Sequence, residues 1–311
     1  MTTSAVKIQK LSKSYNGSEA LSDINITILD GQFFGLLGPN GAGKSTTINI
    51  LTGLVRKDSG NIAVFGKDIE KDYRFTRSQI GTAQQELSID WFFPIEKLLQ
   101  YQAGYYGISP KNAKERIEEL LNRLGLWSKR KSRLRQLSGG MKRRYQLAKA
   151  LVHDPKIIIL DEPTAGIDVE LRHELWDYLR QLHQQGKTIL LTTHYIEEAE
   201  LLCEYVSIIH RGKVITEGAP KNLISQMGKA GITVHLTKWD DTLHALLQSY
   251  SYTQNKSQLH FTVKDAETEI SKIISIISKN GCQIQRVETT KSSLEDVFLS
   301  LTGRGINEQT T

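Results

Sequence analysis

The sequence of 311 residues lacks any run of about 18 apolar residues, the length that a helix needs to cross a membrane. Residues 1–7 also lack the apolar core of a signal peptide. Only two cysteines are present, Cys203 and Cys282, and they stand far apart without the spacing of metal ligands. We therefore expect a reduced, cytosolic chain that has two structural thiols and does not span a bilayer.

The remaining composition, 39% hydrophobic and 24% charged, is typical of a globular protein. A formal net charge of +6 is compatible with an anionic partner such as nucleic acid or a membrane surface. The densest basic region comprises residues 129–135 together with Lys142, Arg143 and Arg144. No aromatic-interleaved nucleic-acid module accompanies it. We therefore expect a solvated or phosphate-facing surface there, and no nucleic-acid partner.

The most informative segment is residues 38–46, with the sequence GPNGAGKST. An apolar stretch before it predicts a buried strand and the residues after it predict a helix, which is the context of a P-loop. The alternative is a glycine-rich turn between two core elements. In a P-loop, glycines let backbone N–H groups turn inward on phosphates at the positive end of the helix. The candidate nucleotide-binding residues are Gly38, Pro39, Asn40, Gly41, Ala42, Gly43, Lys44, Ser45 and Thr46.

Two of these residues have side chains suited to specific tasks. Lys44 would place a positive charge at the β- and γ-phosphates, and the hydroxyl of Ser45 would complete a Mg²⁺ shell. Two carboxylates, Asp161 and Glu162, follow an apolar run that predicts a parallel strand buried on both faces. Asp161 is a candidate Mg²⁺ partner, and Glu162 would polarise the attacking water. Alternatively, the two acids cap a helix that begins near Pro163.

The rest of the chain predicts an α/β fold with helices on both sides of a sheet. Ligands of such sheets bind beyond the carboxyl ends of the strands, where the sequence also places His194. We expect a nucleotide-binding domain over residues 1–227, with a helical part at about 87–155. A linker at 228–231 would lead to a small α+β domain at 232–303 and a polar tail at 304–311.

Four motifs, in this order and spacing, resemble those of the ATP-binding-cassette (ABC) ATPases. They are the P-loop, the signature LSGGM at 137–141, the strand ending in Asp161-Glu162, and His194. The P-loop alone fits many nucleotide hydrolases, whereas the signature after a helical insert is specific, and the match covers residues 5–220. The resemblance implies a P-loop NTPase cassette with a RecA-like parallel-sheet core, an antiparallel β subdomain and an α-helical subdomain. It also implies an ATPase that uses ATP and Mg²⁺.

The resemblance assigns Ser138, Gly139 and Gly140 to nucleotide held by the P-loop of a second cassette. Their hydroxyl, bare N–H groups and helix dipole suit a γ-phosphate. Asp168, in the motif AGID, would cross the dimer. His194 would keep the γ-phosphate and the catalytic base in register.

Two further residues have roles that the resemblance implies. Tyr15 matches an aromatic residue that stacks on adenine; the alternative is a buried tyrosine at a strand end. Gln85 matches a glutamine that senses Mg²⁺ and the attacking water. The neighbouring Gln84 makes an error of one position possible.

A single cassette, the absence of a membrane span, and the sequence SLEDVFL at 293–299 resemble ATPase subunits of ABC-2-type exporters. Residues 102–107 and 193–200 point to the bacterial multidrug-type branch. The resemblance implies a motor that homodimerises around two Mg·ATP and drives a separate membrane permease. Such a subunit would lie on the cytoplasmic face of the inner or plasma membrane. The permease contact would fall at about 85–100, where residues 91–93 (WFF) either seat a permease helix or form subdomain core.

The alternative is a soluble cassette protein that acts on ribosomes or DNA. Such proteins usually have two cassettes in one chain or a long coiled-coil insertion. This sequence has one P-loop, one signature, no internal repeat and no sustained heptads, which favours the transporter subunit.

Overall fold

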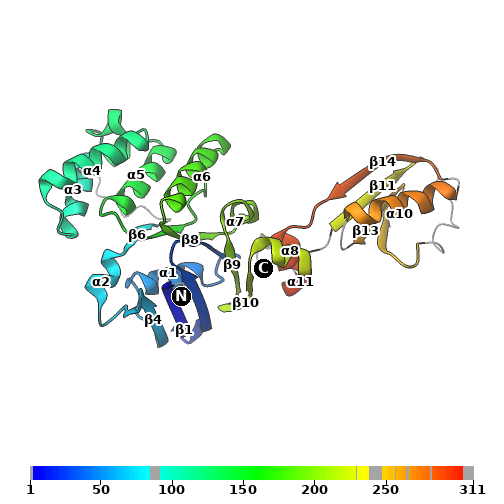
Figure 1. The fold of residues 1–311 in the computed structure, drawn as a ribbon, viewed down its shortest axis with the longest axis horizontal. Helices are drawn as coiled ribbons and strands as arrows, with labels where there is room; N and C mark the ends of the chain where they lie inside the picture. The colour runs from blue at the N-terminus through cyan, green and yellow to red at the C-terminus, as the bar shows by residue number, and fades with distance from the viewer. Residues whose placement is uncertain are drawn as a thin grey trace. The chain divides into compact units, whose positions relative to one another are not determined.

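The computed structural model describes residues 3–84, 92–228, 230–237, 247–255, 257–263, 266–280 and 282–303. They belong to two compact units, Met1–Gly218 and Ala219–Thr310, which Figure 1 shows as ribbons. Within the described residues, every helix is too short or too polar to cross a membrane.

The first unit contains an antiparallel sheet with the strand order β2-β1-β4-β5. Strands β1 (Ser4–Tyr15) and β2 (Ser18–Leu29) form a long hairpin, as their alternating pattern predicts. At the turn between them, Asn16 and Gly17 have φ angles of 49° and 83°. A two-residue hairpin turn requires such left-handed conformations, which Asn-Gly adopts readily. Strands β4 (Ser59–Val64) and β5 (Lys67–Asp68) complete the sheet.

A second, six-stranded sheet forms the centre of this unit. Its order is β10 (Lys213–Gly218), β9 (Tyr205–His210), β3 (Phe33–Leu37), β8 (Thr188–Thr193), β7 (Ile157–Asp161) and β6 (Ile80–Ala83). All neighbouring pairs run parallel except β10 and β9. Strands β3, β7 and β8 are buried at every position, as continuous apolar runs predict for strands covered on both faces.

Helices cover this sheet and form a separate group at one side of the unit. Helices α1 (Lys44–Leu51), α2 (Tyr73–Ser78), α6 (Val169–Gln184) and α7 (Ile196–Leu202) connect its strands. Helices α3 (Ile95–Tyr105), α4 (Pro110–Arg123) and α5 (Gly139–Leu151) form the group, with two short 3₁₀ turns between α4 and α5. Figure 1 shows α3, α4 and α5 side by side. The apolar face expected on α4 is buried, including Ile117, Leu120 and Leu121.

The second unit is an α+β structure with its own core. Its sheet has the order β12 (Ser251–Asn255), β13 (Gln258–Val263), β11 (Ala230–Leu236) and β14 (Ile284–Thr290), all antiparallel. Helix α10 (Ala266–Lys279) contributes buried Ile273 and Ile277 to the core, opposite Ile232 and Phe261. From the sequence we group residues 220–227 with the first domain. In the structure, α8 (Pro220–Met227) falls in the second unit because it packs against α11 (Leu294–Thr302).

Candidate active site

The loop between β3 and α1 follows the backbone path that its glycines permit. Gly41 and Gly43 have φ angles of 79° and 112°, which residues with a Cβ rarely adopt. A Cβ on Gly43 would also lie only 2.6 Å from Cδ2 of Leu21. At Gly38, a Cβ would collide with the carbonyl oxygen of Ile209. The loop is therefore closely packed on its inner side and can be built only with glycine at these positions.

Lys44, the first residue of α1, is held by the loop that precedes it. Its Nζ donates to the carbonyl oxygens of Gly38 at 2.7 Å and Pro39 at 3.2 Å. The same Nζ lies 3.4 Å from Oε1 of Glu162, and both side chains are buried. Burial lowers the pKa of Lys44, while the carboxylates of Glu162 and Asp161 act in the opposite direction. Lys44 thus joins the phosphate loop to the end of β7.

The two carboxylates at the end of β7 have different partners. Oδ1 of Asp161 accepts a hydrogen bond of 2.5 Å from the hydroxyl of Thr192 on β8. Oε1 of Glu162 lies 3.2 Å from Nδ1 of His194, which follows β8, as well as near Lys44. Glu162 also has a φ of 48°, a left-handed conformation that costs a non-glycine residue on the order of 1 kcal/mol. The parallel sheet thus brings Lys44, Glu162 and His194 together around one carboxylate oxygen.

Arg143, in the first turns of α5, is a central residue that the sequence did not reveal. Its guanidinium donates to the carbonyl oxygens of Gln84, Asp161, Glu162 and Pro163 and to Oε1 of Gln146. Burial lowers its pKa, and nearby carboxylates oppose that shift. The expectation of a solvated or phosphate-facing side chain is therefore wrong for Arg143. Its guanidinium fixes the backbone that places Glu162.

The signature residues lie at the start of α5 and face solvent. The Oγ of Ser138 caps the helix by accepting from the backbone N–H of Met141 at 3.3 Å. Ser138 and Gly139 are exposed. Gly140 is half-buried because Leu171 of α6 packs against it, so closely that a Cβ on Gly140 would collide with Cδ2 of Leu171. Within the described residues, no hydrogen bond or ion pair joins these three residues to Lys44, Glu162 or His194.

Asp168 and Tyr15 are also exposed. Oδ1 of Asp168 caps α6 by accepting from the N–H of Leu171 at 2.9 Å. Tyr15 is 43% exposed at the end of β1, with Nζ of Lys13 5.3 Å from its ring centroid. The alternative of a buried tyrosine is therefore wrong. The ring is free to meet a planar ligand.

Gln85 and Trp91 lie outside the described residues. Their neighbours are described. The carbonyl oxygen of Gln84 accepts from Arg143 and, at 2.8 Å, from Nε2 of Gln146. Phe92 and Phe93 are 78% and 41% exposed, so the subdomain-core alternative is wrong for these two rings.

The fold and the site together are those of ABC ATPase cassettes. The solved structure of cbiO1 from Clostridium perfringens, part of the ABC transporter complex cbiONQ, is 30% identical with a TM-score of 0.65. It matches 72% of this chain and 92% of that one. A dimeric ATP-binding cassette in a post-hydrolysis state, bound to ADP and Pi, is 26% identical with a TM-score of 0.64. The match covers 69% of this chain and 98% of that cassette.

Sequence comparisons extend the match to the second unit. Residues 21–165 match the family model "ABC transporter", and residues 218–302 match "ATP-binding protein DrrA1-3-like, C-terminal domain". The Nod factor export ATP-binding protein I of Paraburkholderia xenovorans is 37% identical over 99% of this chain and all of that protein. The protein of the same name from a Rhizobium species is 36% identical over 98% and 99%. The chain therefore belongs to the ATP-binding subunits of ABC-2-type export transporters.

Proposed function

We propose that this chain hydrolyses ATP as a homodimer and that hydrolysis drives a separate ABC-2-type permease in an export transporter. The observation that carries the proposal is the position of the Glu162 carboxylate. It lies at the carboxyl edge of the parallel sheet between Lys44 and His194, 3.4 Å and 3.2 Å from their nitrogens. A carboxylate beside a phosphate loop at this edge can take a proton from an attacking water.

Each residue of the proposed site around the Glu162 carboxylate has a role. Glu162 is the general base, and His194 keeps its carboxylate oriented toward the γ-phosphate. Lys44 exchanges its hold on Gly38 and Pro39 for phosphate oxygens, because a cation prefers charged acceptors to carbonyl groups. Asp161 and Ser45 would hold Mg²⁺, which suits their hard oxygen donors and would neutralise phosphate charge. Gln85 is proposed as a further Mg²⁺ and water contact.

The exposed residues suggest where the second copy binds. Ser138, Gly139 and Gly140 present a helix N-terminus to solvent, where unpaired N–H groups and the positive end of the dipole favour an anion. No described contact brings this anion-binding surface to the phosphate loop of its own chain. We propose that it binds the γ-phosphate of ATP held by the partner, with Asp168 crossing the same interface. Tyr15 would stack on the adenine of its own ATP.

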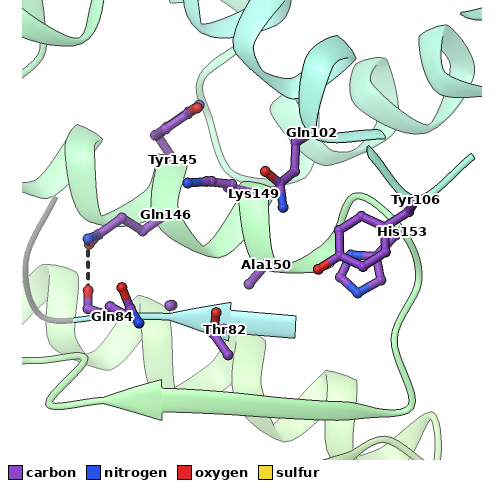
Figure 2. A pocket seen from close by; sticks show the side chains of 10 residues that line it. Thr82, Gln84, Gln102, Tyr106, Tyr145, Gln146, Lys149, Ala150 and His153 are labelled. Atoms are coloured by element: carbon purple, nitrogen blue, oxygen red, sulfur yellow. Dashed lines mark hydrogen bonds between the residues drawn. The ribbon is translucent and has the colours of Figure 1, made fainter. Parts of the chain in front are cut away.

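The proposed permease contact lies beside the group formed by α3, α4 and α5. A cavity of about 130 Å³ opens between β6, α3 and α5, and Figure 2 shows Gln84, Gln102 and Lys149 around it. The carbonyl oxygen of Gln84 is bound to Arg143, which also binds the carbonyl oxygen of Glu162. A permease segment that displaces this wall would therefore act on the catalytic turn through one side chain. Such a contact would hold the chain at the cytoplasmic face of the membrane.

Replacing Glu162 by Gln tests the proposed base. The Glu162→Gln variant should lose ATP hydrolysis by about 100- to 10,000-fold, since an amide cannot accept the proton of the water. It should still bind ATP, because Lys44 and the loop are unchanged, and it should accumulate as an ATP-bound dimer in size-exclusion chromatography.

The matched control is Glu170→Gln, an exposed acid in the first turn of α6, which should hydrolyse ATP like the wild type. Wild-type turnover by Glu162→Gln would show that another group is the base. A monomer at saturating ATP would contradict the dimer.

A further inference from the structure

Glu198, in the first turn of α7, is a buried acid that the proposed hydrolysis does not use. It is 0% exposed, and no described Lys, Arg or His nitrogen lies within 4 Å of its carboxyl oxygens. A buried carboxyl without an ion pair is costly, so such a group is held by hydrogen bonds. Burial raises the pKa of Glu198, while its hydrogen-bonding neighbours and then Arg172 act in the opposite direction.

Its neighbours come from three different segments of the chain. Nε1 of Trp176 on α6 donates to Oε1 at 3.0 Å. The hydroxyls of Thr193 and Thr164, both fully buried, lie beside the carboxyl group. Oε2 of Glu198 and Oγ1 of Thr164 are buried, and neither has a well-aligned hydrogen bond to another described group. The Thr164 hydroxyl is one of the hydrogen-bonding neighbours that oppose the rise in the pKa of Glu198, so the two groups lie close together.

Two of these segments adjoin the proposed catalytic residues, and the third is the helix that Asp168 caps. Thr164 stands two residues after Glu162 and four before Asp168. Thr193 directly precedes His194, and its Oγ1 accepts from the N–H of Tyr195 at 2.9 Å, which fixes the turn around the histidine. Trp176 lies on the helix that Asp168 caps. One carboxyl group thus touches the segment after Glu162, the residue before His194, and α6.

We propose that Glu198 is a positioning residue, which holds the Thr193–His194 turn in register with the segment that runs from Glu162 to Asp168. Its effect on the reaction passes through the 3.2 Å approach of His194 to Glu162. Misplacing a group of this kind by about 1 Å can lower a rate about 100-fold while leaving substrate binding intact. The inference rests on the proposed function, because it takes Glu162 and His194 to act together.

The test compares Glu198→Ala with Glu198→Gln in the full chain. In Glu198→Ala, kcat for ATP hydrolysis should fall about 10- to 100-fold, with KM for ATP within about twofold of the wild type. Glu198→Gln should recover most of the lost kcat, since its amide oxygen can accept from Trp176 and its NH₂ can donate to Thr164. Trp176→Phe, which removes one donor, should fall between the two. Glu197→Ala, the exposed neighbour on the same turn, is the matched control and should behave like the wild type.

Three outcomes would overturn the inference. They are wild-type kcat in Glu198→Ala, equal loss of kcat in Glu198→Gln and Glu198→Ala, and a rise in KM that accounts for the loss. If Glu198→Ala does not fold, the inference is decided by Glu198→Gln, which keeps the volume of the site, and by Trp176→Phe, which keeps an aromatic ring there and removes its N–H donor. Glu162→Gln in the same assay separates the two proposals. Activity in that variant contradicts the catalytic base, whereas an inactive Glu162→Gln beside a fully active Glu198→Ala contradicts only the positioning role.

Discussion

The two groups of nucleotide-site residues differ in what they contact. The buried half-site, formed by Lys44, Asp161, Glu162 and His194, finds its partners within the chain. The exposed half-site, formed by Ser138, Gly139, Gly140 and Asp168, has helix caps as its described hydrogen bonds and faces solvent. Helix starts with unpaired N–H groups are prepared for a ligand that comes from outside. The difference supports the proposal that one chain assembles the hydrolytic end of a site and leaves the other end for a second chain.

Mixing two inactive variants is the strongest test of this difference between the buried and the exposed half-site. Ser138→Arg should disable the exposed half-site and Lys44→Ala the buried one, so each homodimer should be inactive. In a heterodimer of the two, the intact loop of one chain meets the intact signature of the other. With random pairing, half of the dimers have one working site of two, so roughly a quarter of wild-type ATPase activity should return.

The control for this experiment is a mixture of Ser138→Arg with the double variant that carries both changes. Its heterodimers contain no intact pair and should stay inactive. Equal activity in the two mixtures, including none in either, would contradict the division of each site between two chains.

Replacing Arg143 tests how the buried half-site is held in place. Arg143→Met removes the guanidinium donor from four backbone carbonyls and from Oε1 of Gln146, so the turn at Glu162 should loosen. The carbonyl oxygens of Gln84 and Glu162 each keep one other donor. We expect kcat to fall about tenfold or more and the free energy of unfolding to fall by on the order of 3 kcal/mol, measured by ATPase assay and chemical denaturation. Arg135→Met, an exposed member of the same basic region, should change neither. Unchanged kcat in Arg143→Met would show that the turn holds Glu162 without this side chain.

The smallest effect concerns His153, just beyond the buried end of α5. Its ring stacks on Tyr106 with centroids 3.6 Å apart, and its Nε2 lies 3.0 Å from the carbonyl oxygen of Ile80. Burial lowers the pKa of His153 from 6.5 to about 4. Because the unfolded chain then binds the proton more tightly, stability is fully present above pH 6.5 and declines as the pH falls toward 4.

An NMR titration of the ring should give a midpoint near 4 for His153. Ser138→Arg, at the exposed start of the same helix, should leave that midpoint unchanged. A midpoint near 6.5 would mean that the ring is solvated, and a shift caused by Ser138→Arg would show that the two ends of α5 are coupled.

The meeting of the site residues at the edge of the sheet could be predicted from the sequence. The contacts of Arg143 that hold the backbone there could not. Continuous apolar runs predict buried parallel strands, so the meeting of Lys44, Glu162 and His194 follows from where those runs end. Arg143 contacts carbonyl groups of residues 20 and 59 positions away. Every residue has a carbonyl group, so no side-chain pattern marks the ones that an arginine will bind.

The boundary between the two units could not be predicted from the sequence either. An eight-residue helix such as α8 has an apolar side that can pack on whichever domain offers a matching surface. Its partner, α11, lies more than 60 positions along the chain, beyond the reach of local periodicity. Tertiary contacts therefore determine both how Arg143 holds the backbone at Glu162 and where the second unit begins and ends.

The missing Cβ of Gly140 has a consequence for how two copies would separate. Leu171 of α6 fills the space against Gly140, and Arg144 of α5 reaches to within 4.0 Å of Glu174 on α6. These contacts thus join the capped starts of the two helices, at Ser138 and Asp168, so that they would move together. A tilt of these two helix starts would withdraw the proposed γ-phosphate contact and Asp168 together. Each chain would then release the partner's nucleotide in one step, because the two interface elements of that chain move together.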